Sequence, residues 1–520
     1  MPHQVLLPSP GRPGVLLRWT LALGFCLLLL GPAAAQEALP EHARSRIHCE
    51  VAIVGGGAAG LHSAYRLGPR LGSRVCLFEK LDRLGGRIYD IARTPGGPVF
   101  GTGALRIMEG QTVVFSLADE LGISYEAAPW RDDLISARGE FAYSSDDINV
   151  LAYPHVPDGV TETDLYNQLR FGPLRRRAAQ FPDFRSYVRQ AVGEQGYHFL
   201  TDVFRFRADF EYPLDARGYL DYLDEEWDVC CTPFYPNGGM SEFIRRMEQR
   251  ALRSGVRIYK SEPALEIRGL GRRRYVIQTP RYAVTADRLI IAVDAEGFKH
   301  VRGDVAEAIQ SQPQFQDLLG VRVVTITQWW PHAFWLGARA PRDVRRAWTT
   351  EHCLNFIEIP IASYAANQLV TRSVYDDGIR CVTFWENTAK RSIAAVEAEI
   401  ARGLAYLFPG VRIPRPLKTH VQVWPAAWYW LRGGTRFTNA DIARWALDPL
   451  PGEDIVLVGE SYNPQRSGWT DGAYKSSINA LNARYGFSLP GATMTLAGPV
   501  APPPRPLHAP VRRSRSQGGL

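Results

Sequence analysis

Short apolar runs alternate along the chain with stretches in which apolar residues recur every three or four positions, the pattern of an α/β protein. Residues 51–54 (VAIV) predict a buried parallel strand, because the run is apolar throughout and rich in β-branched residues. Helical spacing follows from Leu61 to Leu67, and residues 74–78 (RVCLF) predict a second strand. Two further buried strands are expected at residues 289–293 and 455–458.

The middle of the chain shows the same two patterns, apolar runs typical of strands and apolar residues at helical spacing. Residues 111–121 and 184–192 show helical spacing within a polar, aromatic region. Residues 321–327 predict a strand. Periodicity alone therefore indicates alternating strands and helices, without their order in a sheet.

A glycine-rich turn, residues 55–60 (GGGAAG), joins the first strand to the first helix. Gly55 permits the tight turn, Gly57 lets the backbone approach a pyrophosphate, and Gly60 lets helix and strand pack closely. The N-terminus of the helix offers N–H groups to the phosphates. Glu79 ends the second strand, 19 residues after Gly60, where its carboxylate can accept hydrogen bonds from a ribose diol. These features together predict a dinucleotide-binding site.

A second glycine motif, R-x-G-G-R, occupies residues 83–87 directly after this acid. It resembles the second phosphate-binding signature of the flavin-dependent amine oxidase superfamily. Gly86 allows a close backbone approach, and the planar guanidinium of Arg87 can pair with a phosphate. An ordinary glycine turn between solvated arginines is the alternative. A dehydrogenase that uses only NAD does not need this element, so the resemblance implies FAD as the cofactor.

Other segments resemble the same superfamily. Residues 101–106 (GTGALR) are similar to the G-x-M-R segment of its L-amino-acid oxidase branch, which lies along the flavin. Leu105 stands where that branch usually has methionine. Residues 236–240 (PNGGM) are similar to a turn before a helix, and residues 262–265 (EPAL) to the strand whose backbone meets the adenine.

The C-terminal part carries the strongest resemblance. Gly459 and Glu460 follow a predicted strand, and residues 468–472 (GWTDG) open a helix, as in the signature that closes the FAD site of the family. The N-terminus of that helix would point its dipole at the flavin. The glycine motif and the resemblance together imply FAD contacts at Gly55, Gly57, Ala58, Ala59, Gly60, Glu79, Lys80, Gly86, Arg87, Gly103, Ala104, Leu105, Arg106, Ala264, Gly459, Glu460, Gly468, Trp469 and Thr470.

The resemblance also implies the domain organisation. We expect an α/β fold with a discontinuous Rossmann-type FAD-binding domain and an inserted α+β substrate-binding domain. The FAD-binding domain is expected at residues 46–110, 232–300 and 420–487. Residues 111–231 and 301–419 are expected to form the substrate-binding domain.

Amine oxidation at a flavin mainly requires that the substrate's α-hydrogen is held against the ring in a dry cavity. In the resembling oxidases, the arginine at the position of Arg106 binds the substrate carboxylate through a bidentate ion pair. Pairing with a flavin phosphate or an acidic neighbour is the alternative. The resemblance also implies that Trp469 covers the substrate side of the ring and that the Gly468 carbonyl orients the ammonium. Phe384 and Trp424 are candidates for an apolar substrate pocket, with core packing as the alternative.

One departure from the family concerns the flavin N5. The family usually has a lysine that hydrogen-bonds a water there, on a strand before an aromatic-rich stretch. That stretch corresponds to residues 329–335 (WWPHAFW), and the best candidate for the lysine position is Arg322. An always-charged guanidinium cannot shuttle a proton as a perturbed lysine can. This difference argues against fast reoxidation of the flavin by O2, or against turnover altogether.

The leading hypothesis is an extracellular FAD-dependent L-amino-acid oxidase. It would convert an L-amino acid, O2 and water to a 2-oxo acid, ammonia and hydrogen peroxide. A primary-amine oxidase and an amino-acid 2-monooxygenase on the same scaffold are the alternatives. A secreted flavin-binding protein without turnover is a third class, motivated by Arg322. The expected partners are a small amine or amino acid and O2, and we allow for a homodimer.

The net charge of +7 on the 520 residues sits mostly at the two ends. Residues 1–35 contribute +2 and residues 500–520 contribute +4, so the body is nearly neutral. A neutral body without a groove-reading motif is not expected to bind nucleic acid. The proline- and arginine-rich segment 500–520 is expected to be a disordered tail.

The N-terminal 35 residues have the pattern of a secretory signal peptide. Arg18 precedes an apolar run, residues 19–30, which is shorter than the ~20 residues that a spanning helix needs. Small residues then mark a cut after Ala35. We therefore expect a secreted protein, or a periplasmic one in a bacterium, without stable membrane insertion. Six cysteines remain beyond the cut; their spacing suggests no metal site, and an oxidising compartment permits one or two disulfides.

Overall fold

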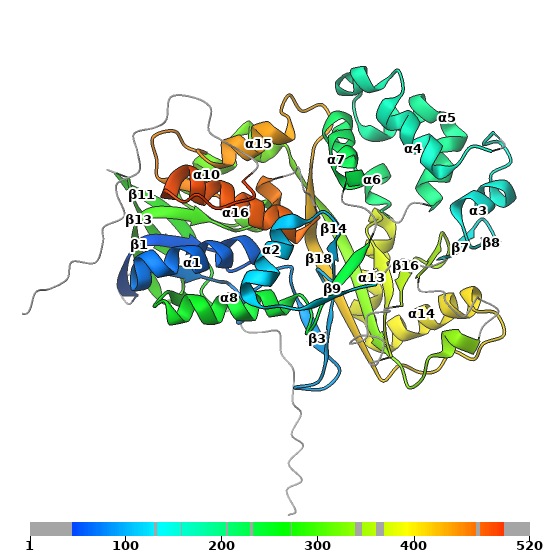
Figure 1. Cartoon of the computed structure of the whole chain (residues 1–520), viewed down its shortest axis with the longest axis horizontal. Coiled ribbons are helices and arrows are strands. Elements are labelled where there is room, and N and C mark those ends of the chain that lie inside the picture. The colour runs from blue at the N-terminus through cyan, green and yellow to red at the C-terminus, as the bar shows by residue number, and fades with distance from the viewer. Residues whose placement is uncertain are drawn as a thin grey trace, which may run out of the picture. The chain divides into compact units, whose positions relative to one another are not determined.

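Two large sheets with their helices organise the part of the chain that the structure describes (Figure 1). The computed structural model describes residues 44–128, 133–157, 159–203, 206–228, 232–271, 273–337, 346–359, 369–463 and 468–492. The predicted signal peptide and the predicted C-terminal tail lie outside these ranges.

The first sheet has seven strands in the order β10-β2-β1-β13-β12-β11, with β19 paired to β13. Strand β1 is parallel to β2 and β13, and β19 is parallel to β13, whereas β12 is antiparallel to both β13 and β11. The strands are β1 Ser45–Val54, β2 Val75–Phe78, β10 Arg257–Tyr259, β11 Glu266–Gly271, β12 Arg274–Gln278, β13 Tyr282–Ile291 and β19 Ile455–Leu457.

Strand β1 is buried on both faces, which explains its continuous apolar run. Val51 and Ile53 belong to one hydrophobic core, and Ala52 and Val54 belong to another. The helices of the first core are α1 Ala58–Leu71, α2 Thr112–Leu121, α8 Ser241–Arg253 and α16 Thr470–Tyr485. The helices of the second core are α9 Ala295–Phe298, α10 Asp304–Gln310, α11 Pro313–Gln316 and α15 Asn439–Ala446.

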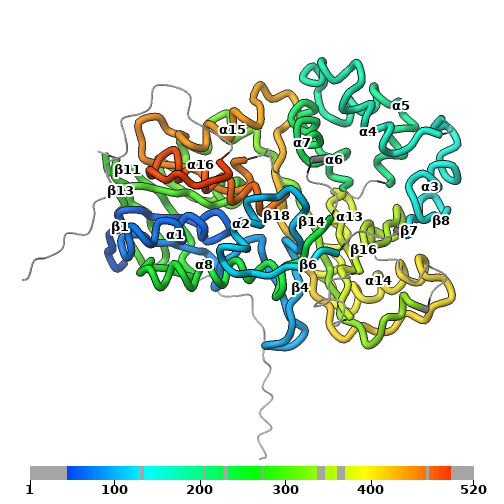
Figure 2. The backbone as a smooth tube through the Cα atoms, viewed as in Figure 1, coloured from blue at the N-terminus to red at the C-terminus, as the bar shows by residue number. Residues whose placement is uncertain are grey.

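The second sheet also has seven strands, in the order β18-β14-β17-β16-β15-β7-β8. Its two longest strands, β14 and β18, are antiparallel neighbours although they are far apart in the sequence (Figure 2). Val324 and Ile326 of β14 pack against α13 and α14. The elements are β7 Asp133–Ala137, β8 Glu140–Ala142, β14 Leu318–Trp329, β15 Arg346–Thr349, β16 Asn355–Glu358, β17 Val370–Asp376, α13 Ile379–Arg391, α14 Ile393–Leu407 and β18 Lys418–Leu431.

A helical region packs around an aromatic-rich core to which β14 and β18 also contribute Val323, Trp424 and Trp428. Its helices are α3 Ser145–Ala152, α4 Glu162–Phe171, α5 Phe184–Val203, α6 Ala208–Glu211 and α7 Ala216–Asp228. Helix α5 is interrupted at Gly193, whose φ of +74° is left-handed. Two small sheets complete the connections, formed by β3 Asp90–Ala92 and β4 Val99–Gly101, and by β5 Ile107–Met108, β6 Tyr125–Ala127 and β9 Pro233–Pro236.

The predicted α/β class with a Rossmann-type sheet is confirmed by the parallel strands on either side of β1. The predicted strands correspond to β1, β2, β13, β14 and β19, and the predicted helices to α2 and α5. Two segments differ from the predicted boundaries. Strand β18 begins the segment 420–487 but belongs to the second sheet, and α2 begins the segment 111–231 but packs in the first core.

Two disulfide bonds lie within the described residues. Cys49 of β1 is bonded to Cys76 of β2, and Cys353 is bonded to Cys381 of α13. The other two cysteines beyond the predicted signal, Cys230 and Cys231, fall outside the described ranges. In those ranges no helix combines the length and apolar character needed to cross a membrane.

Candidate active site

The glycine turn after β1 contains two packed glycines and one open one. A Cβ atom at Gly55, whose φ is +104°, would lie 2.5 Å from the Ala292 carbonyl oxygen. A Cβ at Gly60 would lie 2.0 Å from the Gly55 carbonyl oxygen, whereas a Cβ at Gly57 would meet nothing within 4 Å. Gly55 and Gly60 therefore serve packing, and Gly57 faces open space where a phosphate could approach the backbone.

The N-terminus of α1 lies beside this open glycine. Ala58 and Ala59 are its first two residues, its N-cap residue Gly57 provides no side-chain cap, and its first turn has no acidic residue. The R-x-G-G-R turn lies against it, because a Cβ at Gly86 would be 3.3 Å from the Gly57 Cα. The two glycine motifs thus line one cradle at a helix N-terminus, which favours an anion.

The predicted ribose acceptor, Glu79, is buried at the end of β2 and bound by the backbone. Its Oε2 accepts a hydrogen bond from the Gly56 N–H at 2.7 Å, and its Oε1 accepts one from the Leu81 N–H at 2.9 Å. Burial raises the pKa of Glu79, and these two donors oppose that rise. The carboxylate is therefore fixed beside the glycine turn. Lys80 is exposed, and Ala264 is half-buried between β10 and β11.

Glu460 joins three segments of the cofactor region. Arg87, predicted to bind a phosphate, donates through Nη1 to Glu460 Oε2 at 2.7 Å and to the Ala427 carbonyl at 2.6 Å. Glu460 Oε1 accepts from the backbone N–H groups of Tyr429 at 3.2 Å and Gly468 at 3.0 Å. The Arg87–Glu460 pair therefore ties the second glycine motif to β18 and to the start of α16.

Helix α16 begins at Thr470 and has an uncapped N-terminus. Its N-cap residue Trp469 makes no side-chain cap, and Gly468 before it has a φ of +78°, in the left-handed region that favours glycine. The Gly459 N–H donates to Ser476 Oγ at 3.1 Å, which joins the end of β19 to this helix. The Gly468 N–H just before the helix donates to Glu460, which places the N-terminus of α16 beside Glu460, and Asp471 in the first turn pairs with Lys475.

The segment 101–106 runs along β14 and β18. The Thr102 carbonyl accepts hydrogen bonds from Thr325 Oγ1 at 2.7 Å and from Trp424 Nε1 at 3.4 Å. A Cβ at Gly103 would lie 1.9 Å from the Arg87 carbonyl oxygen, so only glycine fits there. Trp424 therefore holds this segment in place.

A buried ion-pair network surrounds Arg106. Its Nη1 donates to Glu358 Oε1 at 2.8 Å, and Arg372 Nη1 lies 3.5 Å from Glu358 Oε2. The Tyr235 hydroxyl donates to Glu358 Oε1 at 3.2 Å. The side chains of Arg106 and Glu358 are 13% and 2% exposed. Arg106 therefore pairs with an acidic residue, as the alternative interpretation allowed. That residue is Glu358 of β16, which is distant from Arg106 in the sequence.

The charges in this network support one another. Burial opposes the charge on Glu358, but the nearby guanidiniums of Arg106 and Arg372 hold its pKa below the ordinary value. Burial is the largest influence on Arg106 and opposes its charge, but Glu358, Tyr235, Tyr375 and Glu226 together raise the pKa of Arg106. Burial and the neighbouring charge of Arg106 lower the pKa of Arg372, and the Glu358 carboxylate opposes that fall, so the two guanidiniums share one counter-charge.

Arg372 also anchors the segment that carries Arg106. Its Nη2 donates to the carbonyls of Gly101 and Gly103, both at 3.1 Å. Leu105 is buried in a small core with Phe100, and Ala104 is half-buried. The predicted flavin-side residues and the predicted carboxylate-binding arginine thus belong to one segment attached to β16 and β17.

An aromatic group, Phe206, Tyr375 and Trp428, lies next to this network. The rings of Tyr375 and Trp428 are nearly parallel, with 6° between their planes and centroids 6.4 Å apart. Phe206 meets both rings edge-on, at 5.8 and 6.1 Å. The Arg372 guanidinium lies 5.8 Å from the Tyr375 ring centroid, and a Cβ at Gly468 would lie 3.9 Å from Trp428 Cβ. The aromatic group therefore lies between the arginine network and the start of α16.

Trp469 faces helix α7. Its Nε1 donates to Glu226 Oε2 at 2.9 Å and to Oε1 at 3.2 Å. Both side chains are half-buried. Glu226 also contributes to the raised pKa of Arg106, after Glu358, Tyr235 and Tyr375. Arg106, Tyr375, Trp469 and Glu226, from four separate segments, are thereby brought together.

Two predicted site residues lie elsewhere. Arg322 donates through Nη2 to Glu386 Oε2 of α13 at 2.6 Å. Thr325, three residues later on β14, is the residue that contacts Thr102. Phe384 packs beside Trp385 in the core under α13, with ring centroids 5.1 Å apart. The expectations for Arg322 at the flavin N5 and for Phe384 in the substrate pocket therefore do not fit this geometry.

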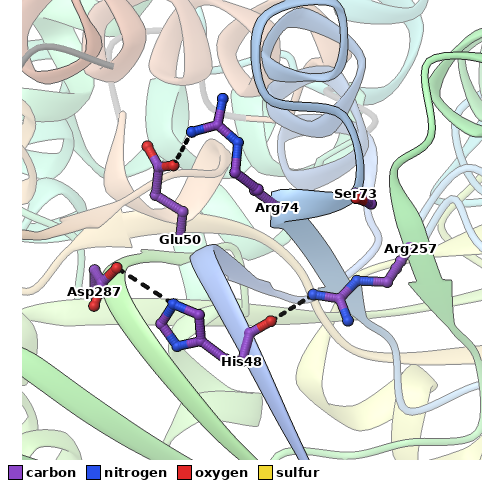
Figure 3. A pocket seen from close by; sticks show the side chains of 6 residues that line it. All are labelled: His48, Glu50, Ser73, Arg74, Arg257 and Asp287. Atoms are coloured by element: carbon purple, nitrogen blue, oxygen red, sulfur yellow. Dashed lines mark hydrogen bonds and ion pairs between the residues drawn. The ribbon is translucent and has the colours of Figure 1, made fainter. Parts of the chain in front are cut away.

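A surface hollow of about 340 Å³ lies near the start of β1, away from the glycine turn that follows its end (Figure 3). Its charged groups are bound within the hollow: Arg74 pairs with Glu50, and His48 Nε2 lies 3.5 Å from Asp287 Oδ2. It is lined by His48, Glu50, Ser73, Arg74, Arg257 and Asp287. In the described ranges, no cluster of three or more His, Cys, Asp or Glu side chains could hold a metal ion.

A family model for flavin containing amine oxidoreductase matches residues 58–482, most of the chain. The chain belongs to this family. As a flavin containing amine oxidoreductase it is an FAD-dependent oxidoreductase of the amine oxidase type.

Curated relatives of this amine oxidoreductase match shorter segments. Mouse lysine-specific histone demethylase 1B is 36% identical over 113 residues, 21% of this chain and 13% of that protein. The FAD-dependent oxidoreductase dbaF of Emericella nidulans is 30% identical over 171 residues, 32% of this chain and 34% of that protein. Protoporphyrinogen oxidase 2 of Arabidopsis thaliana is 38% identical over 73 residues, 14% of each chain. The chain thus spans between 13% and 34% of the length of these relatives.

Among solved structures, engineered putrescine oxidases are similar. A double mutant of that enzyme has a TM-score of 0.60 and 18% sequence identity, covering 84% of this chain and 99% of its own. A triple mutant has a TM-score of 0.59 with the same identity and coverage. At this identity, the likeness shows that the amine oxidoreductase shares the fold.

The residues present fit FAD. The open space at Gly57, at the uncapped N-terminus of α1, suits the pyrophosphate, and Glu79 beside it suits the ribose. The uncapped N-terminus of α16 suits the negative charge of a reduced flavin. When bound, FAD supplies the two-electron acceptor for amine oxidation.

Sequence reasoning missed Glu358, Arg372 and Tyr375. Glu358 ends the buried strand 355–358 (NFIE), and Arg372 lies inside the strand 370–376 (VTRSVYD). A charged residue within a buried strand needs a partner, because an isolated buried charge is very costly. That signal could have identified the two residues, although not the partner of each.

Proposed function

We propose that the protein is an FAD-dependent oxidase of L-amino acids. The observation that carries the proposal is the position of Arg106. Its guanidinium is almost buried, its segment also carries Gly103 and Ala104, and the aromatic group lies beside it. A charged fork at this place suits a substrate that bears a carboxylate next to the carbon to be oxidised.

The Arg106 guanidinium can bind a substrate carboxylate while it keeps its hydrogen bond to Glu358. A guanidinium has five N–H donors in one plane, and Nη1 is the donor to Glu358. Arg372 shares the same Glu358 carboxylate, so these three side chains comprise two positive charges and one negative. A carboxylate from the substrate would therefore meet a favourable potential in a site of low dielectric.

The neighbouring residues would orient the rest of the substrate. The rings of Tyr375 and Trp428 offer apolar walls that exclude water, and the Gly468 carbonyl would accept a hydrogen bond from the amine. Holding the α-carbon in this way supplies most of what a flavin oxidation needs from the protein. The overall reaction takes an L-amino acid, O2 and water to a 2-oxo acid, ammonia and hydrogen peroxide.

A primary-amine oxidase is the second candidate. It is favoured by the Glu358 partner of Arg106, which already provides the guanidinium with a counter-charge. Putrescine oxidases are among the solved structures that share the fold, which fits an amine without a carboxylate. Substrate class therefore depends on whether Arg106 binds a second carboxylate.

The deciding experiment compares three groups of substrates on the purified, FAD-loaded protein. Hydrogen peroxide release is measured with the twenty L-amino acids, with their decarboxylated amines and with putrescine. We expect peroxide from L-amino acids only. Peroxide from amines alone would replace the proposal with a primary-amine oxidase, and a carboxamide product would indicate a 2-monooxygenase. A flavin that no substrate reduces anaerobically would indicate a binding protein without turnover.

The variant Arg106→Ala tests the role of the guanidinium. We expect the amino-acid KM to rise about 100-fold, because a charge-assisted hydrogen bond contributes up to ~3 kcal/mol. Bound FAD should remain. Arg322→Ala is the matched control, because Arg322 pairs with Glu386 of α13. Unchanged kinetics in Arg106→Ala would contradict the carboxylate role.

We also propose that the protein is secreted after removal of residues 1–35. The disulfides Cys49–Cys76 and Cys353–Cys381 support this, since structural disulfides persist in oxidising compartments. Mass spectrometry of the protein from the culture medium should find an N-terminus at Gln36. A mature chain that retains residues 1–35 inside the cell would contradict it.

A further inference from the structure

Glu226 is a carboxylate beside the candidate substrate position with no role in the function proposed so far. It lies on α7 and remains half-buried rather than packed away. Both of its oxygens accept from Trp469 Nε1, at 2.9 and 3.2 Å. Burial, followed by the charge of Glu226 and a hydrogen bond to it, raises the pKa of Tyr222. Trp469 and Tyr222 therefore hold the carboxylate in one orientation.

Tyr222, which hydrogen-bonds to this carboxylate, packs against further aromatic rings. Tyr222 meets the Trp430 ring edge-on, with centroids 4.5 Å apart, and Tyr219 meets the same ring at 5.1 Å. These aromatic rings come from three elements: Tyr219 and Tyr222 from α7, Trp430 from β18, and Trp469 from the start of α16. Aromatic faces attract cations, and a carboxylate beside them adds an opposite charge for an ammonium or guanidinium group.

A second carboxyl group lies behind the rings. The Tyr219 hydroxyl donates to Asp209 Oδ2, and Asp209 is only 3% exposed. Tyr222 feels the charges of both Glu226 and Asp209. Burial raises the pKa of Asp209 to about 8, so Asp209 is mostly neutral at pH 7, and Glu226 is the acidic group that the proposal uses.

We propose that Glu226, with the rings of Tyr222, Trp430 and Trp469, forms a subsite for a positively charged substrate side chain. This rests on the proposed function and names its substrate class: L-amino acids whose side chains end in an ammonium or a guanidinium. Arg106 would receive the α-carboxylate and Glu226 the distal cation. Such a substrate would interact with both residues, whereas a diamine would interact only with Glu226 and an apolar amino acid only with Arg106.

The experiment compares three substrates of nearly equal shape on the FAD-loaded protein. L-Lysine carries the distal ammonium, L-norleucine lacks it, and Nε-acetyl-L-lysine keeps the length without the charge. We expect kcat/KM for lysine to exceed that of both neutral substrates by about 10- to 100-fold, the range for a charge-assisted hydrogen bond. A wild-type enzyme that prefers norleucine or acetyl-lysine would overturn the subsite without any variant.

The variant Glu226→Gln assigns the preference to this carboxylate. We expect the lysine-to-norleucine ratio of kcat/KM to fall about 10- to 100-fold. Asp221→Asn is the control on the same helix, because Asp221 pairs with Arg175 and is 46% exposed. It should leave the ratio unchanged. Flavin absorbance and the thermal midpoint check that each variant is folded.

The outcomes separate this inference from the proposed function. An unchanged ratio with a uniform loss on both substrates would mean that Glu226 serves a group common to all substrates, and the subsite would be wrong. Oxidation of neutral L-amino acids but not of lysine would overturn the subsite and leave the oxidase function standing. Oxidation of cadaverine but of no L-amino acid would overturn the function itself.

Discussion

Replacing Glu358 by glutamine tests the buried network directly. The carboxylate of Glu358 accepts from Arg106 and Tyr235 and lies 3.5 Å from Arg372 Nη1, and it is 1% exposed. Glutamine keeps the shape and one carbonyl acceptor but removes the negative charge. Two guanidiniums then lose a counter-charge in a region of low dielectric.

The magnitude follows from burial. Removing one member of a buried ion pair costs about 3–5 kcal/mol, because the remaining charge is desolvated without compensation. Glu386→Gln is the matched control, since Glu386 and its partner Arg322 are 33% and 37% exposed. A pair of that kind contributes about 0–1 kcal/mol. The free energy of unfolding, measured by urea denaturation of the FAD-loaded protein, should therefore fall much more for Glu358→Gln.

The pH dependence gives the sign of the effect. The two guanidiniums lower the pKa of Glu358 in the folded protein below 4.5, the ordinary glutamate value. A group with a depressed folded pKa contributes its full stability above the unfolded pKa and loses it as the pH falls through the folded pKa. The stability difference between wild type and Glu358→Gln should thus be constant near neutral pH and shrink below about pH 4.5. Equal losses in Glu358→Gln and Glu386→Gln, or a difference that grows in acid, would refute this reasoning.

Three further outcomes follow from the geometry. Gly57→Ala should leave the apoprotein stable but weaken FAD retention. Gly60→Ala should lower the thermal midpoint of the apoprotein, because its Cβ would lie 2.0 Å from a carbonyl oxygen. Equal thermal midpoints in the two variants would contradict this. Burial raises the pKa of Asp209 from 3.8 to about 8, so the folded state resists its ionisation. Asp209→Asn should gain stability relative to wild type as the pH rises from about 4 to about 8 and level off above that; a pH-independent difference would contradict this. Thr325→Val should shift the flavin absorbance and Arg322→Ala should not, because only Thr325 contacts the segment 101–106; the reverse result would return Arg322 to the site.

The cofactor region could be predicted because its signals are local. Gly55, Gly57 and Gly60 lie within six residues, and each is needed for a backbone reason that the turn itself sets. The neighbouring strands are apolar on both faces, which identifies them without knowledge of their partners. The fold class followed from these short-range patterns.

The substrate region could be predicted only in part, because its contacts are long-range. Arg106 and Glu358 are 252 residues apart, and nothing in the sequence near either residue specifies the other. The assignment of Arg322 failed for a different reason. The resemblance specifies only a residue on the strand before the aromatic-rich stretch 329–335, and it does not decide which residue of that strand is meant. Arg322 pairs with Glu386 of α13, whereas Thr325 of the same strand contacts Thr102.

The same network links the cofactor position to the proposed carboxylate position. Arg372 holds the carbonyls of Gly101 and Gly103, and Glu358 holds the guanidinium of Arg106 in the same short segment. Displacing that segment would move the flavin-side backbone and the arginine fork together, so neither can shift alone. Since an oxidation of this kind depends on placing the α-carbon against the flavin, one rigid segment that sets both positions removes a source of misalignment. We therefore expect substitutions of Glu358 or Arg372 to weaken FAD retention and raise the amino-acid KM in parallel, whereas substitutions of Glu226 should alter the choice among substrates while FAD stays bound.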